Sequence, residues 1–222
     1  MIDQHLLRDV GETLFATNEH GRLVGAAPML HVLRTATDVL VRCHADLDDG
    51  VADTLAQIAM RPRDRPGRWS REYAALARAL AGVEPLRAIR SGMLFGFPEG
   101  VSGHGGPVAI CEDNADLLFG GLDEWRPDVA NRLPMAAMVV DGRAVSVCSS
   151  VRASQSVHCA GVETVPEHRG RGLAAKAVAA WATMVEATGA TPIYGTTFDN
   201  LSSQGVIRTL RLQLVASEFS VE

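Results

Sequence analysis

Apolar and polar positions along the second half of the chain repeat at the periods of strands and helices. Two apolar runs are joined by Asp141-Gly142, and Asp-Gly between such runs predicts a two-residue β-hairpin turn. A later stretch has apolar residues at helical spacing and stops at Gly189, a residue that commonly ends a helix. We therefore expect the order β-α-β-β-β-α-β-α-β in the segments 107–111, 113–125, 134–140, 144–149, 156–165, 172–188, 191–197, 201–210 and 214–221.

The first half has a weaker pattern. The runs 13–16 and 22–25 flank the turn signal Asn18-Glu19-His20-Gly21 and predict a hairpin, with further strands over 38–43 and 87–95. Between these strands we expect two helices. Asp48 or Asp49 caps the first helix, which runs to residue 58, and the second has apolar residues at helical spacing, namely Tyr73, Leu76, Leu80 and Val83.

Two loops divide this region. The basic, proline-containing segment 61–68 predicts a solvated loop in preference to an anion site. The glycine-rich segment 99–106 matches no phosphate-loop template, because no Lys-Ser/Thr pair follows it.

The length of 222 residues suits one large domain or two small ones. We place a boundary in the glycine-rich loop, with an N-terminal α/β region over 1–106 and a second domain over 107–222.

Composition narrows the class of protein. Hydrophobic residues make up 47% of the chain, which is enough to bury a core. The formal net charge of −5 gives no general electrostatic reason to bind nucleic acid or an anionic membrane. No apolar run approaches the ~20 residues that span a bilayer, and the N-terminus lacks the pattern of a secretory signal. We expect a cytoplasmic protein.

The four cysteines, at positions 43, 111, 148 and 159, are scattered and form no C-x-x-C pair. They predict reduced thiols, without a disulfide framework or a zinc site. Cys148 and Cys159 fall on successive expected strands and could be neighbours, although buried apolar packing is the favoured role of each.

The candidate functional residues lie between the expected strand that ends at Val165 and the expected helix that follows Gly172. Pro166 ends the strand, and the turn Arg169-Gly170-Arg171-Gly172 then opens the helix. The first N–H groups of a helix have no partner within it, and they carry the positive end of the helix dipole. Two glycines let an anion approach this backbone, and two arginines add charge. The turn predicts an anion site the size of a pyrophosphate.

This turn resembles motif A of the GNAT acetyltransferases, R/Q-x-x-G-x-G/A, filled here by Arg169, Gly172 and Ala174. The segment Asp199–Gln204, with Asn200, resembles the Asn-x-x-Ser/Ala start of the next helix in that family. The resemblance covers about residues 107–222 and implies an α/β (α+β) fold with a mixed, mostly antiparallel sheet flanked by helices. Residues 1–106 would be a degenerate companion half.

The resemblance also implies an activity and a set of site residues. Acetyl-CoA would be the cosubstrate, with no metal, and an amine acceptor would attack the thioester directly in a ternary complex. The pantetheine arm would pair with the strand that ends at Val165, and backbone N–H groups near 163–165 would form an oxyanion hole. The residues implied to bind the cosubstrate are Thr164, Val165, Arg169, Gly170, Arg171, Gly172, Leu173, Ala174, Asn200 and Ser203.

The proton-transfer residues are less clear than the binding residues. Glu163 is the preferred general base and His158 the other candidate, and strand alternation puts the two on opposite faces. A solvent-facing strand position is an equal interpretation of Glu163. Ser203 could hydrogen-bond the sulfur, but an alcohol is a poor acid, and a helix-start role suits it better. Tyr194 and Phe198 could wall the pocket, with core packing favoured.

Two family features are missing. Ile207 stands where many GNAT enzymes have a tyrosine, and Arg211-Leu212 replaces a common Gly-Phe pair. A non-catalytic acyl-CoA-binding or regulatory module is therefore the first alternative, and a phosphate- or nucleotide-binding domain is the second. The acceptor and the acyl length are open, as is a homodimer; we expect no nucleic acid or membrane partner.

Overall fold

The computed structural model describes residues 4–61, 71–101 and 106–222. It divides into two compact units. The first unit comprises Met1–Leu94, Thr196–Asp199 and Val215–Glu222, and the second comprises Phe95–Gly195 and Asn200–Leu214. Most of the basic segment expected over 61–68 and the middle of the glycine-rich loop, 102–105, lie outside the described residues. Each unit is described below by itself.

The sheet is mixed and mostly antiparallel, and this confirms the predicted fold class. The described part of the chain contains nine strands, in the order β2-β1-β9-β3 for the first unit and β8-β7-β6-β5-β4 for the second. β7 and β8 run parallel. The other pairs with a defined register, β1–β2, β1–β9, β4–β5, β5–β6 and β6–β7, are antiparallel.

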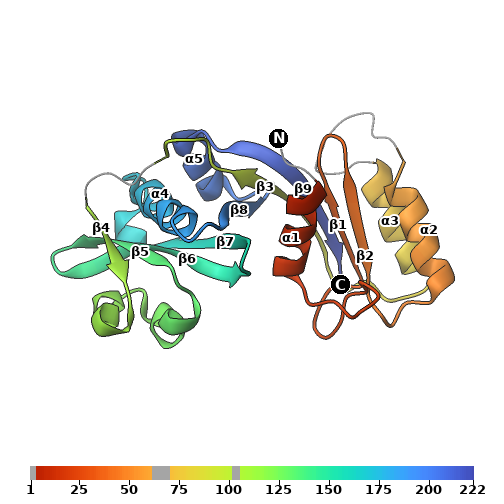
Figure 1. The fold of residues 1–222 in the computed structure, drawn as a ribbon, viewed down its shortest axis with the longest axis horizontal. Helices are drawn as coiled ribbons and strands as arrows, with labels where there is room; N and C mark the ends of the chain where they lie inside the picture. The colour runs from red at the N-terminus through yellow and green to blue at the C-terminus, as the bar shows by residue number, and fades with distance from the viewer. Residues whose placement is uncertain (1–3, 62–70, 102–105) are drawn as a thin grey trace. The chain divides into compact units, whose positions relative to one another are not determined.

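The first unit is a short sheet with helices on both faces (Figure 1). Its strands and helices are α1 (Gln4–Leu14), β1 (Leu30–Arg34), β2 (Val39–Cys43), α2 (Asp49–Ala59), α3 (Arg71–Ala81), β3 (Ile89–Gly96) and β9 (Gln213–Val221). The side chains of Tyr73 on α3 and Phe219 on β9 stack with ring centroids 4.2 Å apart in the middle of the core. α1 lies on the opposite face, where Arg42 pairs with Glu12 at 3.2 Å.

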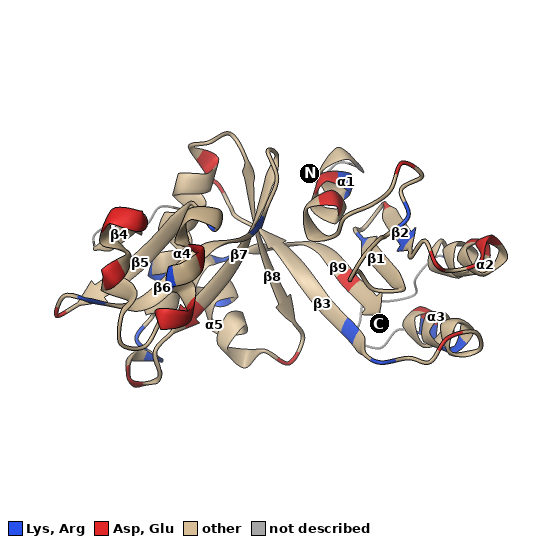
Figure 2. Ribbon diagram, turned by 90° about the horizontal axis from the view of Figure 1, so that it is seen from below, with Lys and Arg blue, Asp and Glu red and all other residues tan. Residues whose placement is uncertain are grey.

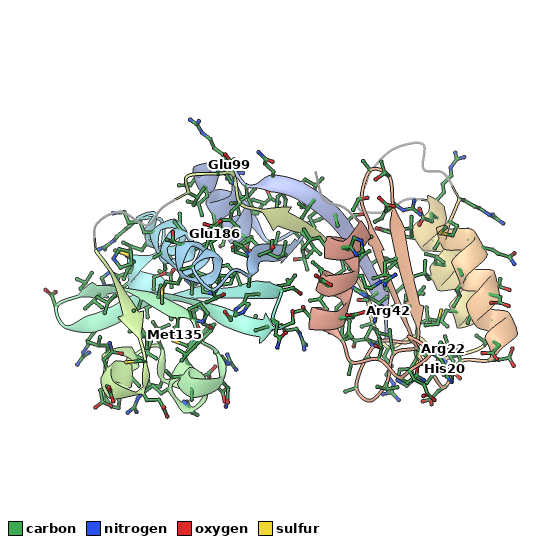
Figure 3. The ribbon with its side chains drawn as sticks, in the orientation of Figure 1. His20, Arg22, Arg42, Glu99, Met135 and Glu186 are labelled. Atoms are coloured by element: carbon green, nitrogen blue, oxygen red, sulfur yellow. The ribbon has the colours of Figure 1, made fainter. Side chains whose placement is uncertain are left out.

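The hairpin expected over 13–25 is wrong in its first arm. Residues 13 and 14 end α1, because Leu7 and Val10 bury one face of a helix at helical spacing. The predicted turn does form, and it is closed by one isolated bridge between Thr17 and Leu23. The guanidinium of Arg22, labelled in Figure 3, donates to the carbonyls of His44 and Leu47. These contacts hold the loop without a paired second strand.

Both helices expected in the first unit are confirmed. Asp48 is the N-cap of α2, and its carboxylate accepts a hydrogen bond from the Gly50 N–H at 2.8 Å. Tyr73, Leu76 and Leu80 are fully buried on α3. Val83 does not share that face, since the helix has already ended at Ala81 and the side chain is exposed.

The second unit contains most of the remaining elements. They are β4 (Pro107–Ile110), the 3-10 helices η1 (Glu112–Leu118) and η2 (Asp123–Asn131), β5 (Met135–Val140), β6 (Arg143–Ala153), β7 (Val157–Thr164), η3 (Pro166–His168), α4 (Leu173–Glu186), β8 (Thr191–Thr197) and α5 (Leu201–Leu210). α4 packs on β5, β6 and β7, and η1 packs against β6. Figure 1 shows these helices on opposite faces of the strands.

The helix expected over 113–125 is replaced by η1 and η2. Gly120 and Gly121 both have positive φ, at 89° and 148°, and they interrupt the segment. The carboxylate of Asp123 accepts hydrogen bonds from both glycine N–H groups, at 3.0 and 2.9 Å. Pro127 lies inside η2 and has no N–H for an α-helical ladder. These local features prevent one continuous helix.

The predicted Asp-Gly hairpin is confirmed between β5 and β6. Asp141 and Gly142 have φ values of 49° and 76°, the left-handed pair that a two-residue turn of this type requires. On the next strand, Cys148 lies opposite Val162, and Cys159 lies opposite Arg152. The two cysteines are therefore not cross-strand neighbours, and both are free and buried.

Candidate functional site

The parallel strands β7 and β8 pair along a short stretch and then part. Their register runs from Val157 with Thr191 to Cys159 with Ile193, whereas β7 continues to Thr164 and β8 to Thr197. A pocket of about 600 Å³ opens beyond the last pair. Its walls come from the end of β7, the turn before α4 with the first residues of that helix, one residue of β8, and α5.

The pocket gathers most of the residues that the sequence predicted. It is lined by Glu163, Thr164, Arg169, Gly170, Gly172, Leu173, Ala174, Asn200 and Ser203. The structure does not bring His158, Val165 or Arg171 to the lining. Val165 is buried and lines a different hollow, beside the β5–β6 hairpin.

Backbone pairing decides which β7 groups can face a ligand. The Val165 N–H donates to the Val145 carbonyl at 3.0 Å, so it points toward β6. Hydrogen-bonding direction alternates along an antiparallel strand, and Glu163 is the partner of Val147 in the same register. The N–H groups of Val162 and Thr164 therefore point away from β6, toward the open side of the pocket. These two positions could hydrogen-bond an extended ligand.

The turn before α4 has the geometry of an anion site. Gly170 and Gly172 have φ values of 75° and 73°, and a Cβ on either would meet open space. Gly172 is the N-cap of α4, and the first bond of the helix runs from the Lys176 N–H to the Gly172 carbonyl. The N–H groups between these residues have no partner within the helix. The side chain of Arg169 folds back, and its Nε donates to the Thr164 carbonyl at 3.0 Å.

Asn200 begins the other helix at the pocket. Its side-chain oxygen accepts a hydrogen bond from the Ser203 N–H at 3.1 Å, so Asn200 is the N-cap of α5. This contact gives the Asn-x-x-Ser pattern a local structural cause. The N-terminal turns of α4 and α5 both reach the pocket wall.

Glu163 and His158 lie on opposite faces of β7, as strand alternation predicts. The Glu163 carboxylate accepts a hydrogen bond of 2.6 Å from the indole N–H of Trp125 on η2. The Arg132 guanidinium lies over the same indole, 5.2 Å from the ring centroid. Glu163 thus has a defined orientation on the η2 face of the pocket.

His158 belongs to the α4 face. Its Nδ1 is 2.8 Å from the Ser150 hydroxyl oxygen, which also accepts a hydrogen bond from the buried Trp181 indole at 3.0 Å. Burial lowers the pKa of His158 from its usual value of 6.5. These contacts describe a structural histidine that packs beneath the helix.

The segment on the Glu163 face is acidic. η1 and η2 contain Glu112, Asp113, Asp116, Asp123, Glu124 and Asp128, against the basic residues Arg126 in η2 and Arg132 directly after it. Each arginine pairs with one of these carboxylates. Figure 2 shows the acidic positions in red next to β4. This face favours a cationic ligand over an anionic one.

The sequence pattern assigned no functional role to Trp125 and favoured core packing over a pocket role for Tyr194. Trp125 is distant from Glu163 in the chain, and no local pattern links them. Tyr194, which the sequence favoured as core, is 1% exposed and also lines the pocket. Ile207, at the position of the family's tyrosine, is not among the lining residues.

Comparison with known families assigns part of the chain. Residues 136–215 match the family described as GNAT acetyltransferase. This segment belongs to the GNAT acetyltransferase family. The GNAT segment includes β5 to α5 and therefore the whole lining of the pocket.

Solved structures resemble the chain beyond the GNAT segment. A GCN5-related N-acetyltransferase-like protein from Streptococcus suis is 16% identical over 98% of this chain and 99% of its own, with a TM-score of 0.50. A GNAT-family acetyltransferase from Colwellia psychrerythraea is 11% identical over 93% of this chain and 80% of its own, with a TM-score of 0.51. At these identities the likeness shows the fold alone.

A structure from Salmonella typhimurium that contains its cofactor acetyl-CoA is 13% identical over 52% of this chain and 93% of its own, with a TM-score of 0.40. No curated protein matches the sequence. Among the described residues, no cluster of three His, Cys, Asp or Glu side chains could hold a metal ion. Within the same ranges no helix has the length and apolarity to cross a membrane.

Proposed function

We propose that the chain is an N-acetyltransferase that moves an acetyl group from acetyl-CoA to a primary amine. The observation that carries this proposal is the pocket at the parting of β7 and β8, within a segment of the GNAT acetyltransferase family. The pocket combines an anion-binding turn, an open strand edge and a carboxylate. The anionic end and the extended amide arm of acetyl-CoA suit the first two parts, and the carboxylate suits an amine acceptor that must lose a proton.

The turn from Arg169 to Ala174 is proposed to bind the pyrophosphate. The unpaired N–H groups at the start of α4 would donate to its oxygens, supported by the positive end of the helix dipole. Gly170 and Gly172 leave the space above this backbone open, because a Cβ on either would lie free of other atoms. Arg171 would contribute through its charge, since it does not line the pocket.

The open edge of β7 is proposed to bind the pantetheine arm. The amides of the arm would pair with the backbone at Thr164, which lies nearer the anion-binding turn, in the manner of an added strand. The N–H group of Val162, nearer the point where the strands part, would stabilise the oxyanion that forms when the amine attacks the thioester carbonyl. Val165 is excluded from this role because its N–H is bound to Val145.

Glu163 is proposed as the general base. An ammonium acceptor must lose a proton before its nitrogen can attack, and a carboxylate within reach can accept that proton. The new N–C bond then forms and the C–S bond breaks, with direct transfer in a ternary complex. The acidic η1–η2 segment on the same face supports a cationic acceptor. His158 is the weaker candidate because it contacts Ser150 under α4.

Calorimetric titration with acetyl-CoA, followed by release of free CoA against a panel of amines, tests this proposal. We expect binding by the wild-type protein, loss of binding in Gly172→Glu, and CoA release with at least one cationic amine. Absence of binding, with no effect of Gly172→Glu, would overturn the proposal. Tight binding with no turnover across the panel would support a non-catalytic acyl-CoA-binding module, which the isoleucine at position 207 favours.

A further inference from the structure

Tyr194 has a buried hydroxyl group without a hydrogen-bond partner among the described residues. Its side chain is 1% exposed, yet it forms part of the pocket wall. Buried polar groups in proteins are nearly always hydrogen-bonded, and leaving a donor unpaired is unfavourable. The phenol is therefore suited to donate to an atom of a bound molecule.

The position of Tyr194 in the pocket indicates which atom of the bound molecule would accept this hydrogen bond. Tyr194 follows Ile193, the last residue of β8 that pairs with β7, so it lies where the two strands part. Val162 and Thr164 form the opposite wall, with the N–H groups assigned above to the pantetheine arm and the thioester oxygen. A thioester at those N–H groups would place its sulfur in the part of the pocket that Tyr194 lines.

We propose that the Tyr194 hydroxyl donates a hydrogen bond to the sulfur of the acyl-CoA and stabilises the charge that develops there. This inference rests on the proposed function. As the amine nitrogen bonds to the acyl carbon, the C–S bond breaks and its electron pair passes to sulfur. The proton of the amine goes to Glu163, and the thiolate takes a proton from water after release. Tyr194 keeps its own proton throughout.

A donor that keeps its proton fits the surroundings of the phenol. Burial raises the pKa of Tyr194, and the Cys148 thiol adds to this rise. The nearby Ser203 hydroxyl partly opposes this rise in the pKa of Tyr194. It is not placed to form a well-aligned hydrogen bond with the phenol. A thiol has a pKa of about 8.5, below that of a tyrosine, so transfer of the proton to sulfur would be unfavourable.

The test does not require the acceptor, because it uses CoA itself. The thiol of bound CoA is titrated through the ultraviolet absorbance of its thiolate, in the wild-type protein and in Tyr194→Phe. A hydrogen bond to the thiolate lowers the pKa of the bound thiol, so we expect Tyr194→Phe to raise it by about one to two pH units. Once an acceptor is found, kcat should fall about 10- to 100-fold with little change in the KM for acetyl-CoA.

The chain offers a matched control, since it contains two tyrosines. The Tyr73 hydroxyl donates to Ser217 at 3.2 Å within the first unit, and Tyr73→Phe should leave the CoA thiol unchanged. Fluorotyrosine incorporated into Tyr73→Phe reports on Tyr194 alone. Its fluorine resonance should shift when CoA binds and shift less with a CoA analogue that lacks the sulfur.

The outcomes separate the two proposals. If CoA binds and its thiol titrates equally in the wild-type protein and in Tyr194→Phe, the role of Tyr194 is overturned and the proposed function stands. If the wild-type protein binds no CoA, the proposed function fails first. If Tyr194→Phe does not fold, the fluorine experiment decides, and equal shifts with CoA and the analogue lacking sulfur would refute the contact.

Discussion

Glu163 has an unusual combination of contacts for a residue near a strand end. Its carboxylate is fixed by the Trp125 indole, yet it remains exposed to the pocket. A fixed and accessible carboxylate can accept a proton repeatedly without losing its orientation. The hydrogen bond from Trp125 therefore favours the proposal that Glu163 is the general base over the alternative that Glu163 is a solvent-facing strand residue.

Replacing Glu163 with glutamine should lower kcat about 10²- to 10⁴-fold, since the amide cannot accept the amine's proton. The affinity for acetyl-CoA should stay within about twofold, because backbone groups bind the cosubstrate. Steady-state kinetics with calorimetry checks both. Glu167→Gln is the matched control, as Glu167 is a neighbouring acidic residue outside the pocket lining. Equal activity of the two variants would make Glu163 a solvent-facing residue.

His158 should contribute to the pH dependence of stability. Its pKa is lowered by burial in the folded state, so folding favours the neutral ring. Its stabilising effect is therefore fully present above the usual pKa of 6.5 and is lost as the pH falls through the lowered folded value. The melting temperature of His158→Asn should fall less than that of the wild type on acidification.

Thermal melts across this range test the expectation. His20→Asn is the control, because His20 has a side chain that is 77% exposed. If His158→Asn and His20→Asn show the same acid dependence as the wild type, burial of His158 has no thermodynamic consequence.

At the level of elements, α4 is bounded by left-handed glycines at both ends. Gly172 at its start has a φ of 73°, and Gly189 beyond its last turn has a φ of 86°. Open space surrounds both positions. The two sites therefore match in backbone strain and packing and differ in function, because Gly172 alone of the two lines the pocket.

Alanine at either glycine should lower the free energy of unfolding by about 1–2 kcal/mol, since an L-residue is strained at positive φ. Gly172→Ala should in addition weaken acetyl-CoA binding, because its methyl group occupies the approach to the helix N–H groups. Urea denaturation and calorimetry separate the two effects. Comparable loss of acetyl-CoA affinity in Gly189→Ala would mean that the effect comes from helix stability alone.

Elements with strong local patterns could be predicted from the sequence. The Asp141-Gly142 hairpin, α4 and α5 each carry their own turn or cap, and the bounds of β8 and α5 match the expected segments. The first turn of α4 was likewise visible in its glycines. The prediction of a hairpin over 13–25 was wrong because residues 13 and 14 belong to α1. This helix is stabilised by burial of Leu7 and Val10, and that burial depends on the sheet beneath the helix.

The pocket could not be predicted from any single segment of the sequence, because its walls depend on residues that are distant in the chain. Tyr194 has an apolar environment on a strand and is consistent with core packing. Its role depends on β7 and β8 parting after Ile193, which is a property of two strands together. The same holds for Trp125, whose contact with Glu163 joins residues 38 positions apart.

At the scale of the whole molecule, each unit draws on separate stretches of chain. The first unit includes β9 residues from Val215 onward, and β9 pairs with β1 from Leu30 with Val221 to Arg34 with Ser217. Phe219 and Val221 are fully buried in its core. The N-terminal strands and the C-terminal strand are thus parts of one structure.

A fragment of residues 107–222, taken at the predicted boundary, should therefore fail to fold cooperatively. Without β1 and α3, the apolar side chains of β9 would be exposed, and exposed strand edges promote aggregation. Solubility and urea unfolding of this fragment, compared with the full chain, test the expectation. A soluble fragment with a single sharp transition and wild-type acetyl-CoA affinity would show that residues 107–222 are an independent domain.

The pairing of β1 with β9 also sets an order of events during synthesis. β1 leaves the ribosome well before its partner from Ser217 to Val221, because residues 35–216 lie between the two segments. During translation β1 has β2 on one edge and an open edge on the other, while the segments that form the pocket are already emerging. β1 therefore lacks its second partner while residues 35–216 are made, and a chaperone that shields open strand edges would act on β1 during that interval.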